Sequence, residues 1–271
     1  MTVEGGTAGS KFSVGVPVDE ERYDLSVYYT MGPGYGDVEI RHAGAVAGSI
    51  KGYAEEVIPG GRVVLKDVRA GNGVVPLDFT VTGKDPKAAG YAVGIDAFVA
   101  EPKRAYIPEW YVIGPFPNAR DEKLQRLGLD TPYPPEREIK LDAKYEGVDA
   151  QQVSWVLKQT PARGRFDLYD FDPYEMVVVY ALTYVYSPRA ATVPFLLGSD
   201  DGVKVFLNGK EIHRYLAVRV AAPDQDRIPL ALKEGWNVLL LKIENNYGGY
   251  NFYARIIDRE KQLVVSATQT R

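Results

Sequence analysis

Hydrophobic and polar residues alternate in short runs through the first third of the chain. The alternating runs lie at 12–16, 23–29, 38–40, 63–65, 77–81 and 92–98. Alternation with a period of two is typical of a strand with one buried face. Turn-forming segments rich in Gly, Pro and Asn separate the runs, among them 32–36, 59–61 and 71–73. Six or seven short strands at a spacing of roughly ten residues predict an antiparallel β-sandwich.

The same alternation returns near residue 110 and continues almost to the C-terminus. Its runs lie at 110–115, 153–157, 176–186, 193–197, 203–207, 211–212, 236–243 and 252–257. Asn208-Gly209 joins two of these runs and is a strong two-residue signal for a β-hairpin. We therefore expect an all-β chain of two antiparallel β-sandwich (jelly-roll) modules in tandem, with little helix.

Two segments interrupt the alternation and suggest the module boundaries. Residues 103–108 are polar and lie between two prolines, which predicts a short, stiff linker between modules at 1–102 and 109–271. Residues 118–135 lack alternation and are rich in Pro. They are expected to form a long surface loop, with one or two helical turns within 121–129.

Composition narrows the classes of partner. The chain has 271 residues with 27 Gly, 18 Pro, 19 Tyr and no Cys, which suits turns and pleated surfaces. Each module must therefore be stable without disulfides. A formal net charge of −4 leaves no electrostatic footprint for nucleic acid or an anionic membrane. No apolar run is long enough to span a bilayer, and no signal-peptide core follows Met1.

Short motifs in both modules carry a resemblance to known sandwiches. In the first module they are FSVGVP at 12–17, YDLSVYY at 23–29 and GIDAF at 94–98. Through these motifs the first module resembles the galactose-binding-like sandwiches that serve as carbohydrate-binding modules. In the second module they are LGSDDGVKVFLNGK at 197–210, WYVIGPFP at 110–117 and GWN at 235–237. Through these motifs the second module resembles lectin-like sandwiches.

The tandem order resembles the accessory region that follows the catalytic core in bacterial glycoside hydrolases of family 172. No segment matches that family's catalytic core. The resemblance implies a non-catalytic, sugar-binding part of a polysaccharide-degrading enzyme, located outside the cell, in the periplasm or at the cell surface.

The resemblance also implies two places for calcium. In some lectin-like relatives an Asp-Asp pair holds a calcium ion that binds a sugar, and Asp200 and Asp201 match that pair. In many galactose-binding-like relatives, acidic residues near the N-terminus and in the last strand hold a structural calcium. Asp96 matches the last strand, and only Glu4 stands near the N-terminal position.

Residues 200–202 allow two interpretations. One is a calcium site of hard oxygen ligands, completed by carbonyls and Asn208. The other is a tight turn in which the Asp side chains cap backbone amides and Gly202 supplies a positive φ. Two carboxylates alone fall short of the six to eight ligands that calcium takes.

Tyr and Asn side chains in glycine-containing loops are the candidate sugar ligands. A sugar ring presents apolar C–H faces, so its site needs an exposed aromatic ring beside hydrogen-bonding groups. The candidates are Asn246, Tyr247, Tyr250 and Asn251 in the second module, with Tyr35 and Tyr91 in the first. Each Tyr could instead cover a sheet edge.

Other aromatic residues are expected to have structural places. Trp110, Trp155 and Trp236 fall within strand patterns and are expected in the core, Trp236 most of all. The aromatic residues at 169–174 could line a groove or form an edge strand.

Catalytic chemistry finds little support. His42 and His213 each lie near an Arg and are expected at the surface. There is no phosphate loop, zinc-helix motif or nucleophile elbow. We therefore expect a non-catalytic carbohydrate-binding pair whose partners are a polysaccharide or oligosaccharide and a linked catalytic domain. The alternatives are structural or oligomerising modules without sugar binding, and a β-sandwich hydrolase or lyase with two carboxylates across a cleft.

Overall fold

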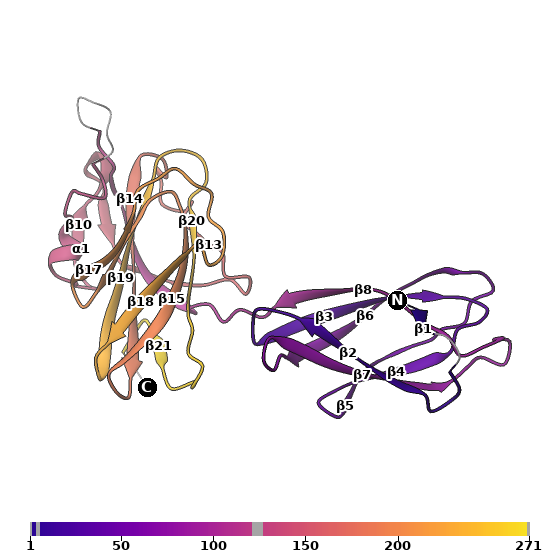
Figure 1. The fold of residues 1–271 in the computed structure, drawn as a ribbon. Coiled ribbons are helices and arrows are strands. Elements are labelled where there is room, and N and C mark those ends of the chain that lie inside the picture. Colours follow the sequence, from indigo (N-terminus) through magenta and orange to yellow (C-terminus); the bar gives the residue numbers. More distant parts are fainter. Residues whose placement is uncertain (1, 4–5, 121–126, 270–271) are drawn as a thin grey trace. The chain divides into compact units, whose positions relative to one another are not determined.

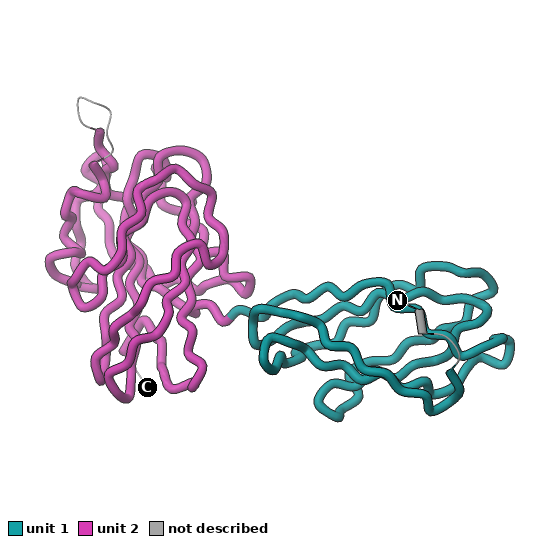
Figure 2. The backbone as a smooth tube through the Cα atoms, viewed as in Figure 1, with its two compact units in different colours: residues 1–104 teal, residues 105–271 magenta. Residues whose placement is uncertain are grey.

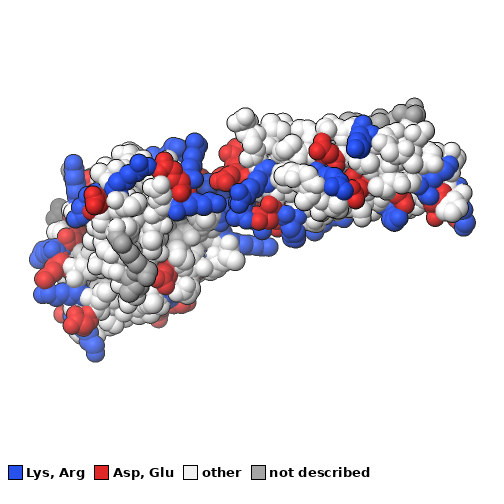
Figure 3. Space-filling model, turned by 90° about the horizontal axis from the view of Figure 1, so that it is seen from below, with Lys and Arg blue, Asp and Glu red and all other residues white. Residues whose placement is uncertain are grey.

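The structure, a computed structural model, describes residues 2–3, 6–120 and 127–269. The chain divides into two compact units, residues 1–104 and 105–271 (Figure 2). Nearly all regular structure is antiparallel strand (Figure 1), so the expected all-β fold is confirmed. Among the described residues, no helix has both the length and the apolar character to cross a membrane. Figure 3 shows basic and acidic side chains interspersed over the visible face of each unit.

Unit 1 is a sandwich of two four-stranded antiparallel sheets. One sheet has the order β1-β8-β3-β6, with bounds Thr2–Val3, Val93–Pro102, Arg22–Met31 and Ile58–Arg69. The other has the order β2-β7-β4-β5, with bounds Lys11–Pro17, Val74–Gly83, Asp37–His42 and Ala45–Ile50. Alternate side chains of these strands, including Leu25, Ile40, Leu77 and Phe79, are fully buried in the core between the sheets.

The turn expected at residues 59–61 is wrong. These residues belong to β6, which runs continuously beside β3, with a register shift opposite Tyr29 and Thr30. A Cβ atom on Gly60 would stand 2.2 Å from the ring of Tyr29, so glycine lets the ring cover the strand. Gly61 has a φ of 92°, a backbone conformation that glycine adopts readily. The segment is therefore an irregular place within a strand.

Unit 2 is a larger sandwich. Its seven-stranded sheet has the order β12-β9-β14-β19-β16-β17, with β21 on β14. The bounds are Val156–Gln159, Glu109–Pro117, Val177–Ser187, Gly235–Asn245, Val203–Leu207, Lys210–Tyr215 and Val264–Ser266. The facing sheet has the order β13-β20-β15-β18, with bounds Phe166–Asp167, Asn251–Ile256, Ala191–Asp200 and Asp226–Leu232. The predicted hairpin is confirmed, because Asn208 and Gly209 join β16 to β17 with φ values of 53° and 78°.

A third layer covers the outer face of the larger sheet (Figure 1). It contains α1 (Pro134–Arg137), the paired strands β10 (Lys144–Glu146) and β11 (Gln152–Ser154), and the short 3-10 turn η1 (Val148–Ala150). Asn118 and Leu129 are both 1% exposed, so the expected surface loop is wrong for these residues. The helical turns expected within 121–129 lie largely outside the described residues.

A buried charge ties this layer to the sheet. Lys242 of β19 is fully buried, and its Nζ donates to the carbonyl oxygens of Leu129 (3.1 Å) and Thr131 (2.6 Å). The same ammonium lies 2.6 Å from Oε1 of Glu136, which also accepts a hydrogen bond from the Tyr180 hydroxyl. Burial lowers the pKa of Lys242, and the Glu136 carboxylate acts in the opposite direction.

The tryptophans follow the expected pattern in part. Trp110 and Trp155 are buried, as expected. Trp236 is only half-buried and packs edge-on against Tyr186, with 5.4 Å between ring centroids. All three tryptophans lie in unit 2. Tryptophan fluorescence therefore reports the unfolding of unit 2 alone.

Candidate functional site

Several loops of unit 2 meet at one end of its sandwich. Strands β15 and β19 end there, and β16, β18 and β20 begin there. Because neighbouring strands run antiparallel, the loops at 169–176, 216–225 and 246–250 come together around residues 200–202. We call this region the Asp end; in Figure 1 it lies at the end of unit 2 away from the C-terminus label.

Asp201 holds two of these loops through its carboxylate. Oδ1 accepts a hydrogen bond from the backbone amide of Arg219 (3.1 Å), and Oδ2 accepts one from the amide of Asn246 (3.0 Å). Asp201 is 1% exposed, so water does not replace these bonds. A buried amide without an acceptor costs about 1–3 kcal/mol. The capping role foreseen for this carboxylate is therefore present, although the amides belong to distant loops.

Glycines let the chain close tightly around the acidic pair. A Cβ atom on Gly249 would stand 2.2 Å from Oδ2 of Asp200. A Cβ atom on Gly202 would stand 2.7 Å from Oε1 of Glu244. Gly202 does not have the expected positive φ, so that part of the turn interpretation is wrong. Close approach to Glu244 is what requires glycine at this position.

Asp200 carries a buried charge beside another carboxylate. It is 5% exposed, and no described residue forms an ion pair with it. Burial, and after it the charge of Asp201, raise the pKa of the Asp200 carboxyl, and a backbone hydrogen bond from Ala221 opposes them. A cation near this carboxylate would favour its charged form.

The described side chains do not by themselves form a calcium site. Asn208, one of the expected ligands, lies at the far end of β16 and donates to Oδ1 of Asn237 (2.9 Å), so that expectation is wrong. In the described part of the chain, no group of three or more acidic, His or Cys side chains could hold a metal ion. Asp200 and Asp201 thus fit a cation in charge, and carbonyl, water or ligand oxygens would have to complete its shell.

Arg219 anchors the loop that passes over Asp201. Its guanidinium makes two bonds to the carboxylate of Asp226, at 3.0 and 2.5 Å, and also donates to Ser199. The neighbouring Val218 and Val220 are 70% and 78% exposed. The loop therefore turns one charged side chain inward and two aliphatic side chains outward.

This ion pair predicts an acid-dependent loss of stability. Burial raises the pKa of Asp226, but His213 and Arg219 outweigh it and lower the pKa from 3.8 to about 2. The stabilisation, about 2 kcal/mol, is complete above pH 4 and is lost as the pH falls towards 2. We expect the urea midpoint of unit 2, followed by tryptophan fluorescence, to fall in this window. In Asp226→Asn the free energy of unfolding should fall by about 2 kcal/mol less over the same pH range. An equal fall in both proteins would show that Asp226 is not the group responsible.

Exposed aromatic residues line the rim of the Asp end. Tyr247 is 57% exposed, and the guanidinium of Arg120 lies 5.7 Å from its ring centroid. Arg120 also donates to Oδ1 of the half-buried Asn246 (2.7 Å). Tyr169 and Tyr174 are 40% and 37% exposed, and their rings pack edge to face with 5.4 Å between centroids.

The loop of Tyr174 is bonded to the loop of Tyr247. Asn245 donates its side-chain amide to the carbonyl of Tyr174 (2.6 Å), and the amide of Gly248 donates to Oε1 of Glu175 (3.4 Å). The sequence allows residues 169–174 to line a groove or to form an edge strand, and the structure places them in a loop. Their proximity to Tyr247 depends on strand topology, so no local pattern could have singled them out.

Two of the predicted sugar ligands are not exposed. Tyr250 is fully buried, and its hydroxyl donates to the carbonyl of Ile243 (3.0 Å). Asn251 is 4% exposed and lies opposite Asp200 in the β15–β20 ladder. The expectation that both are presented to a ligand is therefore wrong. Tyr247 and Asn246 remain at the rim.

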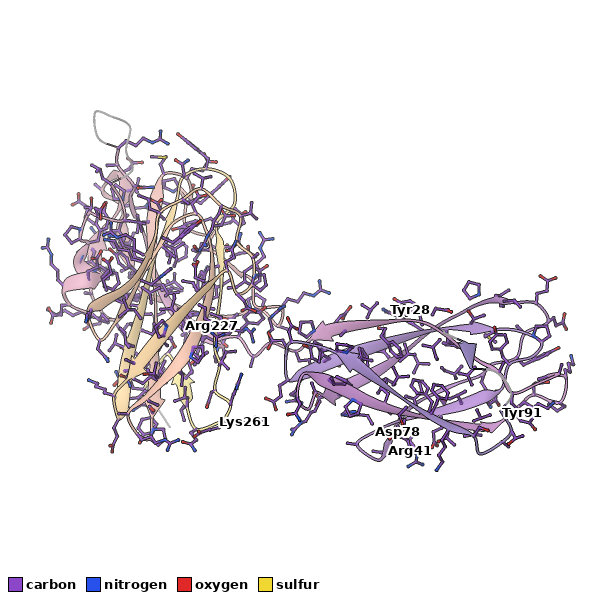
Figure 4. The ribbon with its side chains drawn as sticks, in the orientation of Figure 1. Tyr28, Arg41, Asp78, Tyr91, Arg227 and Lys261 are labelled. Carbon is purple, nitrogen blue, oxygen red and sulfur yellow. The ribbon has the colours of Figure 1, made fainter. Side chains whose placement is uncertain are left out.

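The candidates in unit 1 form a separate group. Tyr35 and Tyr91 lie in loops joined by a bridge between Tyr35 and Ala92, and both are half-buried. The Tyr35 ring fills space that a Cβ on Gly32 would enter at 2.9 Å, and Lys84 lies 4.9 Å from the centroid of the Tyr91 ring (Tyr91 is labelled in Figure 4).

The acidic residue of unit 1 does not belong to a described metal cluster. Asp96 is exposed and accepts a hydrogen bond from the Thr30 hydroxyl (2.8 Å). Glu4, its expected companion, lies outside the described residues. Among the described residues of unit 1, Asp96 does not belong to a group of acidic side chains that could hold a metal ion.

Comparison with known proteins gives no family. No protein-family model matches the sequence, and no curated protein matches it. Among solved structures, a xanthan lyase from Paenibacillus aligns with a TM-score of 0.36 and 10% identity over 98% of this chain and 23% of the lyase. An anti-sigma factor domain-containing protein from Clostridium clariflavum aligns with a TM-score of 0.29 and 14% identity, over 96% of this chain and 82% of that one.

A lectin from Pleurotus ostreatus aligns with a TM-score of 0.27 and 11% identity, over 95% of this chain and 76% of the lectin. Likenesses this low carry no argument about what the chain does.

Proposed function

We propose that the chain is a non-catalytic carbohydrate-binding pair and that unit 2 binds a polysaccharide or oligosaccharide at the Asp end. The observation that carries this proposal is the exposed ring of Tyr247 beside Asn246 and Arg120, on a loop bonded to the loop of the exposed Tyr169–Tyr174 pair. Exposed rings can cover the apolar face of a sugar, and the amide and guanidinium groups can bind its hydroxyls.

Engaged carboxylates favour binding over catalysis. Glycoside hydrolysis needs two carboxyl groups across the bond that is cleaved. At the Asp end, Asp200 is adjacent to Asp201, and both carboxylate oxygens of Asp201 are bonded to backbone amides. In a small cavity beside α1, Glu136 is paired with Lys242, and Glu138 with Lys140. We therefore do not propose an enzyme.

The proposal includes a bound calcium ion, a linked catalytic domain and a location outside the cytoplasm. A calcium ion at Asp200 and Asp201 would compensate the buried charge of Asp200 and could contact sugar hydroxyls. The motifs at 12–17, 23–29 and 197–210 support a place in the accessory region of an enzyme like those of family 172. Such a region would work outside the cell, in the periplasm or at the cell surface, where polysaccharide is found.

Tyr247→Ala is expected to weaken glycan binding about tenfold without changing the unfolding of unit 2. The measurement is a panel of plant, algal and bacterial polysaccharides, followed by titration of the best oligosaccharide, with calcium and with chelator. Tyr28→Ala, on half-buried Tyr28 in unit 1, is the control and should leave binding unchanged.

Each outcome bears on the proposal. Loss of binding with chelator would support calcium at the acidic pair. Unchanged binding in Tyr247→Ala would place the site elsewhere. If the folded protein binds none of the polysaccharides, an oligomerising role is favoured. The exposed Val218 and Val220 would then be the first surface to alter, with light scattering as the readout.

A further inference from the structure

A cavity of about 350 Å³ lies in unit 2 away from the Asp end. It is bounded by residues 187–194, where β14 passes into β15, by Arg227 of β18, and by the loop 257–263. Its volume lies at the low end of the range for small-molecule sites, about 300–1,000 Å³. Such a cavity suits a ligand of about one sugar ring.

The loop that closes the cavity is held in place by hydrogen bonds. The amide of Ile257 donates to the carbonyl of Pro194 (2.8 Å), which fixes the start of the loop against β15. Oδ2 of Asp258 accepts a hydrogen bond from the amide of Leu263 (2.8 Å), which closes the loop on itself. The cavity is therefore formed before a ligand arrives, and its wall includes the apolar Pro194, Ile257 and Leu263.

The charges around the cavity leave two arginines available. Arg189 is paired with Glu260 at 2.5 Å, and Asp258 is engaged by the loop backbone. Arg227 and Arg259 also line the cavity, and no described residue forms an ion pair with either. Arg227 is exposed on β18; Figure 4 labels it and Lys261 of the closing loop.

We infer that this cavity binds a carboxylate-bearing sugar, a uronate, with Arg227 and Arg259 receiving the carboxylate. A guanidinium presents a planar fork of N–H donors that matches a carboxylate. Three arginines against two acids leave a positive balance for an anion. The apolar wall suits the C–H face of the ring, which a free inorganic anion lacks. This inference rests on the proposed function for its choice of a sugar, but the site is separate from the Asp end.

The test is titration of the full chain with galacturonate, glucuronate, galactose and butyrate, followed by calorimetry or NMR. We expect at least one uronate to bind at least tenfold more tightly than galactose and butyrate. Arg227→Gln should weaken uronate binding about tenfold or more. Arg163→Gln is the matched control, because Arg163 is an exposed arginine of unit 2 that does not line the cavity.

The outcomes separate this site from the Asp end. Uronate binding that is lost in Arg227→Gln and kept in Tyr247→Ala supports the inference. Uronate binding that is lost in Tyr247→Ala, or kept in Arg227→Gln, overturns it. Absence of uronate binding also overturns it, as does binding of galactose or butyrate that is equally tight and equally dependent on Arg227. Polysaccharide binding that depends on Tyr247 would leave the proposed function standing in each of these cases.

Discussion

Glu136→Leu is expected to lower the free energy of unfolding of unit 2 by about 3–5 kcal/mol. Glu136 is the carboxylate that faces the fully buried ammonium of Lys242 at 2.6 Å. Removing it leaves the Lys242 ammonium in the interior, where its described neighbours are the carbonyl oxygens of Leu129 and Thr131 and the uncharged rings of Tyr133 and Tyr180. The third layer, which contributes those carbonyls, should loosen first.

Two matched variants separate the buried charge from its surroundings. Glu138→Leu removes a carboxylate next to the same short helix, but Glu138 and its partner Lys140 are 66% and 55% exposed. This variant should cost less than about 1 kcal/mol. The double variant Glu136→Leu/Lys242→Met should recover most of the loss, because a buried ion pair can often be replaced by apolar side chains at little cost.

Urea unfolding followed by tryptophan fluorescence measures these differences, since the tryptophans lie in unit 2. Equal losses for Glu136→Leu and Glu138→Leu would show that the buried charge of Lys242 is not what the carboxylate stabilises. A double variant no more stable than Glu136→Leu would show the same.

Sequence patterns predicted the strands and the hairpin, because these features depend on residues that are close together in the chain. Period-two alternation located most strands because a strand with one buried face exposes every second side chain. Asn208-Gly209 located a hairpin because both residues accept positive φ. The same logic failed at Gly60 and Gly61, which lie within a strand: Gly60 makes room for the ring of Tyr29, and Gly61 adopts a positive φ.

Burial at the candidate site depended on partners that the sequence does not place. Tyr247 and Tyr250 are three residues apart in one loop, and only Tyr247 is exposed. The difference arises because the Tyr250 hydroxyl donates to the carbonyl of Ile243, and the Tyr250 carbonyl accepts a hydrogen bond from the amide of Leu168, just after β13. Neither contact has a signature near residue 250.

Polar residues within strands were equally hard to place. Lys242 looks like a solvated position until a third layer covers its face of the sheet. His42, expected at the surface, is half-buried. Its Nε2 accepts a hydrogen bond from the backbone amide of Arg69 (3.0 Å), and its Nδ1 lies 3.0 Å from the carbonyl oxygen of Pro76. Pairing between distant strands decides both cases.

Asp201→Ala is expected to destabilise unit 2, whereas Asp200→Asn is expected to leave its stability unchanged or to raise it. Asp201→Ala leaves the amides of Arg219 and Asn246 without their acceptor. Two such losses should lower the free energy of unfolding by about 2–5 kcal/mol. The loops that carry Val220 and Tyr247 would also lose their common anchor, so glycan binding should fall with stability.

Asp200→Asn removes one of two adjacent buried charges and keeps a side-chain carbonyl for the amide of Ala221. Without added calcium it should leave the urea midpoint unchanged or raise it, because burial and Asp201 already disfavour the charged form of Asp200. Calcium should raise the midpoint of the wild type but not that of Asp200→Asn, since a ligand stabilises only the state that binds it. A large destabilisation in Asp200→Asn would mean that Asp200 shares the anchoring role of Asp201. An equal calcium effect in both proteins would move the ion away from the acidic pair.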